Sequence, residues 1–113
     1  MIEAVSFGSI VIDGRKFTSD LIVYPDGRVV DSWWREKGHR LSRKDIAALI
    51  ESEPEVIVAG TGINGLMQPD PGLVDFLVKL GIGFYAAKNE KAMTLYNEQA
   101  LKKRVGAGFH LFC

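Results

Sequence analysis

The sequence has little of several residue types and segments that define common protein classes. It contains a single cysteine, Cys113, which excludes an intramolecular disulfide and is typical of a reducing compartment. No activating base is evident for this thiol, so we expect Cys113 to be a buried packing residue. No apolar stretch is long enough to span a membrane, and no basic segment precedes an apolar run at the N-terminus. We therefore expect a cytoplasmic protein.

Net charge and metal ligands are absent as well. The 14 basic and 14 acidic residues cancel, so no overall field attracts nucleic acid or an anionic membrane. The two histidines, His39 and His110, stand far apart without metal-ligand spacing, and no metal site is predicted. The hydrophobic fraction of 47% and the charged fraction of 25% are ordinary for a globular protein. A chain of 113 residues with this composition predicts one domain over residues 1–113.

The first third of the chain has the pattern of an antiparallel β-meander. Asp13-Gly14 and Pro25-Asp26-Gly27 are typical of tight hairpin turns, in which glycine supplies a positive φ. The strands expected around these turns are residues 4–7, 9–13, 15–18, 21–24 and 28–32.

The rest of the chain alternates between helical and strand patterns, which predicts a sheet with helices packed on it. The first expected helix begins at a Ser42–Asp45 capping box. The second begins at Pro71 after an Asp70 cap and stops at Gly81, and the third begins at an Asn89 cap. The expected strands are 56–59, 82–86 and 105–112. The last strand has no strongly polar face, so we expect it at the centre, with Phe109 and Leu111 in the core. The predicted fold is a three-layer α/β domain with a mixed central sheet and an N-terminal antiparallel meander.

A glycine-rich loop follows the apolar strand 56–59. Gly60, Gly62 and Gly65 match the G-x-G-x-x-G spacing of a dinucleotide-binding loop. That loop must open directly into a helix whose amides hold the pyrophosphate, but Pro69 and Pro71 are incompatible with such a helix. We therefore predict a tight turn, and no nicotinamide or flavin cofactor. The backbone amides of Thr61 and Gly62 remain candidates for an anion-binding nest.

Four segments in order along the chain resemble a known family. They are Trp33-Trp34-Arg35-Glu36 with Gly38-His39, Gly60-Thr61-Gly62, Thr94-Leu95-Tyr96-Asn97, and residues 104–113. The chain resembles small archaeal and bacterial domains related to a mitochondrial respiratory complex I assembly factor and to an adipogenesis-associated protein of animals. The resemblance implies a three-layer α/β fold with a mixed sheet, and it implies no established enzyme activity. The mitochondrial relative has a targeting peptide, and we expect none in this protein.

Two groups of residues are candidates for function. The first would bind a ligand near the end of strand 56–59, where the carboxyl ends of parallel strands form a crevice. Its candidates are Gly60, Thr61, Gly62, Lys88, Asn89, Thr94, Asn97, Arg104 and His110. The second would bind a protein partner: Trp33 and Trp34 are consecutive, so a strand would expose one of them, and Trp34 with Arg35 and His39 forms the candidate surface.

For several ligand-site candidates a structural role is an equal or stronger alternative. Arg104 can cap helix carbonyls or hold an anion, and it can lie at the edge of the sheet opposite the ligand crevice. Thr94 and Asn97 share a helix face and can bond the glycine loop or form a structural network. His110 faces the same side as Gly106 and Gly108, where missing side chains leave room for another backbone or a ligand.

The sequence predicts no catalytic constellation. The first hypothesis is therefore a non-catalytic binding or assembly-factor-like module with a protein partner. The alternative is a small-molecule binder or enzyme that holds an anionic ligand at Gly60-Thr61-Gly62. A homodimer is also compatible with the sequence.

Overall fold

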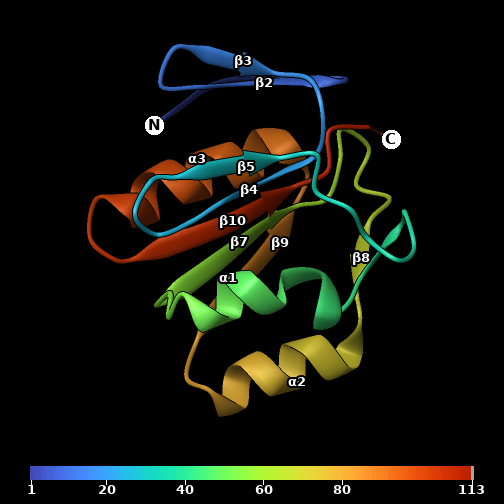
Figure 1. Cartoon of the computed structure of the whole chain (residues 1–113), viewed down its shortest axis with the longest axis vertical. Coiled ribbons are helices and arrows are strands. Elements are labelled where there is room, and N and C mark those ends of the chain that lie inside the picture. The colour runs from blue at the N-terminus through green and yellow to red at the C-terminus, as the bar shows by residue number, and fades with distance from the viewer. Residues whose placement is uncertain (113) are drawn as a thin grey trace.

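A mixed five-stranded sheet forms the centre of the fold (Figure 1). The computed structural model describes residues 1–112, and Cys113 lies outside them. The strand order is β5 (Val29–Asp31), β4 (Leu21–Val23), β10 (Val105–Phe109), β7 (Val56–Gly60) and β9 (Gly83–Ala87). β10, β7 and β9 run parallel, whereas β4 pairs antiparallel with β10 and with β5. The predicted central position of the last strand is confirmed.

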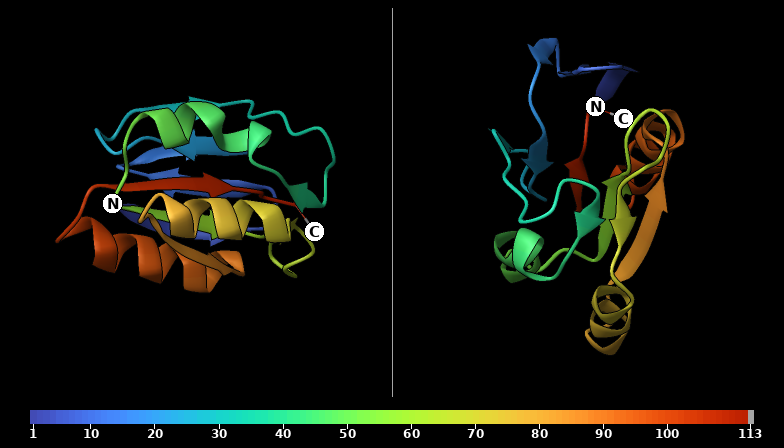
Figure 2. Two further views of the ribbon diagram at one scale, coloured as in Figure 1. Left: turned by 90° about the horizontal axis from the view of Figure 1, so that it is seen from below. Right: turned by 90° about the vertical axis from the view of Figure 1, so that its right-hand side faces the viewer.

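Helices cover both faces of this sheet. α1 (Ala47–Glu51), which follows the short 3-10 helix η1 (Lys44–Ile46), and α2 (Pro71–Lys79) pack with one apolar cluster, and α3 (Asn89–Ala100) packs with the other. Figure 2 shows α1 and α3 on opposite sides of the sheet. The predicted three-layer α/β arrangement with a mixed central sheet is therefore confirmed. In the described part of the chain, residues 1–112, no helix has the length and apolar character needed to cross a membrane.

The N-terminal meander divides between two sheets. β1 (Ile2–Ser6), β2 (Ser9–Ile12) and β3 (Arg15–Phe17) form an antiparallel sheet of their own, while β4 and β5 join the central sheet. The small sheet packs its apolar side chains into the cluster that contains α3. A third, two-stranded parallel pair joins β6 (Arg40–Leu41) to β8 (Gln68–Pro69).

Alternation along β7 explains why its sequence is apolar throughout. Val56 and Val58 belong to the cluster on the α3 side, and Ile57 and Ala59 belong to the cluster on the α1 and α2 side. A strand buried on both faces needs apolar residues at every position. Phe109 follows the same rule in β10 and is fully buried, as predicted.

Helix boundaries follow the sequence signals with two differences. Asp45 accepts hydrogen bonds from the amide and hydroxyl of Ser42, but the segment starts as 3-10 helix and becomes α-helical only at Ala47. α2 begins at Pro71 and is followed by Gly81 at φ +73°, as predicted. Asn89 is not the cap of α3, because Lys88 is, and the buried Asn89 side chain is bonded elsewhere.

Candidate functional site

The carboxyl ends of the parallel strands β7, β9 and β10 meet at one edge of the sheet. Thr61, immediately after β7, donates its amide to the carbonyl of Ala87 at the end of β9 (2.9 Å). His110, immediately after β10, donates its amide to the carbonyl of Gly60 (2.9 Å). The structure thus brings the predicted residues after three strands to this carboxyl edge: Gly60, Thr61, Gly62, Lys88, Asn89 and His110.

Asn89 ties two of these segments together. Its side chain is fully buried, its Oδ1 accepts the amide of Gly62 (3.0 Å), and its Nδ2 donates to the carbonyl of His110 (2.7 Å). Gly60 is required here, because a Cβ at this position would lie 2.6 Å from Asn89 Oδ1 and 2.3 Å from Phe109 Cδ1. This close approach explains the first glycine of the apparent dinucleotide pattern.

The amides of the predicted anion nest are already bonded within the protein. Thr61 donates to Ala87 and Gly62 donates to Asn89, while the carbonyl of Thr61 accepts the amide of Met67 (3.0 Å). An anion at this loop would have to displace those acceptors. The next helix, α2, starts only at Pro71, as the prolines predicted. Together these bonds define a structural loop.

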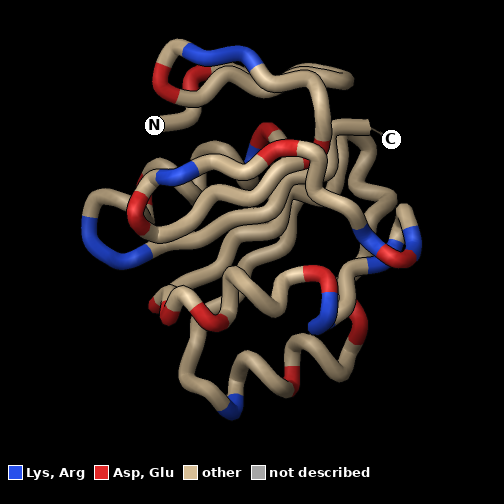
Figure 3. The backbone as a smooth tube through the Cα atoms, viewed as in Figure 1, with Lys and Arg blue, Asp and Glu red and all other residues tan. Residues whose placement is uncertain are grey.

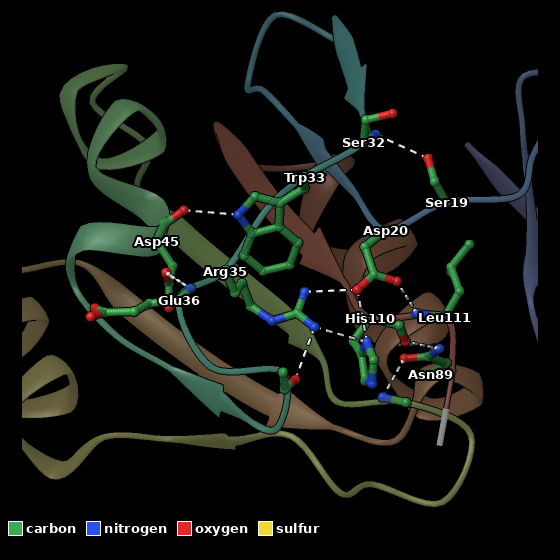
Figure 4. Close-up of polar contacts among 12 residues, drawn as sticks. Ser19, Asp20, Ser32, Trp33, Arg35, Glu36, Asp45, Asn89, His110 and Leu111 are labelled. Carbon is green, nitrogen blue, oxygen red and sulfur yellow. Dashed lines mark hydrogen bonds and ion pairs between the residues drawn. The ribbon is translucent and has the colours of Figure 1, made fainter.

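A buried polar network lies beside the loop (Figure 4). Asp20 Oδ2 accepts from Arg35 Nη1 (2.8 Å) and lies 2.8 Å from His110 Nδ1, while Arg35 Nη2 lies 2.9 Å from the same nitrogen. Asp20 Oδ1 accepts the backbone amide of Leu111 (2.8 Å), and Arg35 Nη2 donates to the carbonyl of Gly38 (2.9 Å). We call Asp20, Arg35 and His110 the buried network. It joins the start of β4, the segment after β5 and the end of β10.

The charges within the buried network balance one another. Burial by itself would raise the pKa of Asp20, but hydrogen bonds from the Leu111 amide, His110 and Arg35 outweigh it and hold the pKa below its ordinary value of 3.8. The Asp20 carboxylate therefore stays ionised and compensates the buried guanidinium of Arg35. That guanidinium also lies over the Trp33 ring, 4.7 Å from its centroid, and Trp33 Nε1 donates to the carbonyl of Asp45 (2.8 Å).

Two nitrogens of the buried network are not satisfied by protein atoms. Arg35 Nε and His110 Nε2 are both buried, and neither has a hydrogen-bond partner within residues 1–112. Buried polar atoms are normally paired, so each unpaired one needs a physical explanation.

Exposed aromatic rings surround the buried network. Phe7 and Phe112 meet edge to face with centroids 5.6 Å apart, and Phe112 lies 6.4 Å from the ring of His110. The ring of His39 lies 6.1 Å from His110 on a further segment. Phe7 is 66% exposed and Phe112 38%, while Trp34, beside Arg35 in the chain, is 77% exposed. We call Phe7, His39, His110 and Phe112 the aromatic cluster. Trp34 is exposed and Trp33 is half-buried, although both follow β5 and neither lies in a strand as the prediction assumed.

Three predicted ligand residues lie away from the carboxyl edge. Arg104 sits at the amino ends of the parallel strands, where it donates to the carbonyls of Ser52 (2.9 Å) and Glu53 (3.3 Å). Asn97 pairs with the backbone amide and carbonyl of Ile2, both at 2.9 Å, and Thr94 Oγ1 lies 3.5 Å from a carbonyl of its own helix. Of the two alternatives for Thr94 and Asn97, Asn97 has the structural one, and the hydrogen bond to the glycine loop comes from Asn89 instead.

Side chains fill the space above the glycines of β10. A Cβ at Gly106 would lie 2.4 Å from Leu49 Cδ1, and one at Gly108 would lie 2.9 Å from Trp33 Cη2. Neither a backbone nor a ligand is needed to explain these glycines. They let α1 and Trp33 pack directly on the central strand, and Trp33 in turn supports Arg35.

A surface hollow of about 270 Å³ lies between the segment 36–45 and the start of α2. Its lining contains both acidic and basic side chains: Glu36, Lys37, Arg40, Ser42, Asp45 and Asp70. Arg40 is already paired with Asp70, and acidic residues outnumber basic ones in the lining, so the hollow does not favour an anion. In the part of the chain that the structure describes, no group of three metal-ligating side chains occurs either.

Sequence reasoning missed Asp20, Phe7 and Phe112. Asp20 stands between two expected strands, where an aspartate normally indicates a turn. Only the folded structure shows its role, because its carboxylate accepts a hydrogen bond from the Leu111 amide near the far end of the chain. Phe7 follows β1 and Phe112 lies beyond the end of β10, and only the fold brings them together.

Solved structures with the same architecture define the fold. A conserved hypothetical protein, PH1505 from Pyrococcus horikoshii OT3, is 28% identical, with a TM-score of 0.90, and the match covers 100% of this chain and 99% of that one. A Bordetella pertussis protein described as a Mth938-like domain is 22% identical with a TM-score of 0.68, covering 97% and 84%. A Bartonella henselae protein described as an outer membrane protein is 21% identical with a TM-score of 0.80, covering 99% and 94%.

This chain has an α/β fold of the Mth938-like type. The family model described as "Protein of unknown function (DUF498/DUF598)" matches residues 2–110, and the chain belongs to that family. Among curated proteins, none matches it. The fold and family are thereby established, and they bring no named activity with them.

Proposed function

We propose that this protein is a cytoplasmic, non-catalytic binding module that docks a partner protein on the carboxyl edge of its sheet. The observations that carry the proposal are the exposed ring pair of Phe7 and Phe112 beside His110, and the exposed Trp34, which precedes the buried Arg35 in the chain. Aromatic side chains are the residues that most often dominate binding energy at protein interfaces. An assembly-factor-like role is the form of binding that the family resemblance implies.

The arrangement of the buried network supports binding rather than catalysis. A general base must reach a substrate proton. His110 is buried, and its Nδ1 already faces both Asp20 and Arg35. These side chains connect three chain segments, and two of those segments carry Trp34 and Phe112 close to the network. In this proposal the network is the rigid support and the rings are the contact surface.

Affinity capture with matched variants tests this function. The purified protein serves as bait in extract of its source cells, together with Trp34→Ala and Phe112→Ala. Leu101→Ala is the control, because Leu101 is 75% exposed, nearly as much as Trp34, and follows α3 at the opposite edge. We expect one specific protein to be lost with both aromatic variants and kept with Leu101→Ala. Equal recovery with all baits would contradict the proposal.

A second candidate function is the binding of a small anionic ligand. The observation that favours it is the pair of buried nitrogens without a protein partner, Arg35 Nε and His110 Nε2. A carboxylate or phosphate oxygen is a suitable acceptor for a guanidinium N–H. Thermal-shift measurements with inorganic phosphate, acetate and dinucleotides, repeated with Arg35→Lys, test this alternative. A shift with wild type that Arg35→Lys abolishes would support it, and unchanged melting in every case would argue against it.

A further inference from the structure

One edge of the central sheet is open and carries no charge. β9 is the last strand in the sheet order, and within residues 1–112 it pairs with β7 alone. Its residues are Gly83, Phe84, Tyr85, Ala86 and Ala87, of which Gly83, Tyr85 and Ala86 are exposed. The three parallel strands β7, β9 and β10 contain no charged residue, and the tube of Figure 3 is uncoloured along them. Proteins normally protect such an edge with charges, prolines or bulges, because it is a template for another strand.

The opposite edge of the sheet is protected. β5 has only three residues, ends at the charged Asp31, and is followed by Ser32 at a positive φ of 56° that ends the extended backbone. Arg28 precedes it. The β5 edge therefore has features that prevent pairing with another strand, and the β9 edge lacks them.

The backbone of β9 defines which groups point outward. Gly83 donates its amide to the carbonyl of Glu55, and the carbonyl of Ala87 accepts the amide of Thr61, so residues 83 and 87 face β7. Alternate residues of a strand direct their N–H and C=O groups to opposite sides. Tyr85 therefore also bonds toward β7, and the amides and carbonyls of Phe84 and Ala86 point away from the sheet.

We propose that two copies of this chain associate through β9, antiparallel, with Tyr85 on the two-fold axis. In this register Phe84 of each copy faces Ala86 of the other, and each of these pairs exchanges two N–H···O=C bonds, which gives four across the interface. Tyr85 meets its symmetry mate in a non-hydrogen-bonded pair, where side chains approach most closely. The interface is isologous and joins the two sheets into one.

The charges next to β9 are compatible with this occupant. Between positions 82 and 88 the only charged residue is Lys88, which the register places opposite Ile82 of the second copy. No like charges face each other, and the net charge of zero means that two copies do not repel each other at long range. A second copy thus satisfies the open edge without burying a charge. This inference is independent of the partner proposed for the carboxyl edge.

Sedimentation velocity across a dilution series tests the pairing. Wild type should form a dimer that dissociates on dilution, because the interface is small. Tyr85→Lys places two like charges on the axis and should sediment as a monomer at every concentration. Val30→Lys is the matched control, because Val30 is 43% exposed on β5 and Tyr85 is 41% exposed on β9. It should keep the wild-type dimer.

Two further variants test the register itself. Ala86→Pro removes an outward N–H that β7 does not use, so it should abolish the dimer and retain the native circular dichroism spectrum. In a Cys113→Ser background, Tyr85→Cys should oxidise to a covalent dimer, because Cα atoms of a non-hydrogen-bonded pair lie about 4.5 Å apart, within disulfide range. Val30→Cys should remain a monomer on denaturing gels.

The outcomes decide the proposal. A wild-type protein that is monomeric throughout the series would overturn it. So would a dimer that persists in Tyr85→Lys, because the contact would then lie elsewhere. If Ala86→Pro does not fold, Tyr85→Lys and the Tyr85→Cys cross-link still decide the result. A negative result for the β9 dimer would not count against partner binding at the carboxyl edge. That proposal is tested with Trp34→Ala and Leu101→Ala, which do not alter β9.

Discussion

Each end of the parallel strands holds an arginine, and the two arginines have different roles. At the carboxyl end Arg35 is buried and contacts Asp20 and His110 from two other segments. At the amino end Arg104 is exposed and donates to the carbonyls of Ser52 and Glu53 just after α1. The sequence places both beside a sheet strand, so residue type alone does not separate them. The difference in burial and in partners is what marks the carboxyl end as the candidate site.

The same contrast holds for exposed apolar residues. Leu101 and Leu80 are exposed near the amino end, whereas at the carboxyl end the exposed rings of Phe7 and Phe112 contact each other and Phe112 lies beside His110. Single exposed apolar residues are normal, but a contiguous group indicates an interaction surface. The proposed function therefore places recognition at the carboxyl end, next to the buried network.

Removing residues 108–113 is the strongest way to break the carboxyl end. The deletion takes away the fully buried Phe109 and Leu111 and the amide that Asp20 accepts. Losing large core side chains costs about 2–5 kcal/mol each, against a total stability of about 5–15 kcal/mol. We expect no cooperative unfolding transition by circular dichroism. A native-like cooperative melt would show that the end of β10 is peripheral.

The two arginines provide the next largest difference. Arg35→Ala leaves the Asp20 carboxylate buried without its cation and should lower the free energy of unfolding by about 3–5 kcal/mol. Arg104→Ala removes exposed bonds and should cost less than about 1 kcal/mol. Urea titration measures both. Adding Asp20→Asn to Arg35→Ala should restore part of the lost unfolding free energy, because it removes the unpaired charge. Equal losses for Arg35→Ala and Arg104→Ala would contradict the difference between the two ends.

The pH dependence of Asp20 is the smallest and most specific effect. Its pKa in the folded protein lies below the ordinary value of 3.8, so its contribution to stability is complete above that pH and is lost as the pH falls through the folded pKa. Asp20→Asn should therefore be less stable than wild type at neutral pH. The gap in unfolding free energy should narrow as the pH falls below 3.8. A gap that stays constant or widens on acidification would contradict the assignment.

Much of the fold could be predicted because its signals are local. The continuous apolar run of β7, the Asp70-Pro71 helix start and the weakly polar last strand each depend on neighbouring residues. Local sequence does not predict how the meander divides between two sheets, because a hairpin follows the same turn rules in either sheet. Packing against α3 decides it, because the small sheet shares that apolar cluster.

The site could be predicted in place but not in its contacts. The carboxyl ends of parallel strands are a general ligand position, which correctly brought Gly60, Asn89 and His110 to one edge. The pairing of Asp20 with His110 spans 90 residues of sequence, and no local pattern encodes it. The role of Asn89 was misassigned for the same reason: a helix cap is a local interpretation, whereas its real partners are Gly62 and His110.

Site-specific photo-crosslinking tests the central claim most directly. A benzoylphenylalanine replaces Trp34 in one sample and Leu101 in another, two positions that are 77% and 75% exposed. Both proteins are irradiated in extract of the source cells, and adducts are identified by mass spectrometry. We predict a discrete adduct with a second kind of protein at position 34 and none at position 101. No adduct at position 34, or the same adducts at both positions, would contradict recognition at the carboxyl edge.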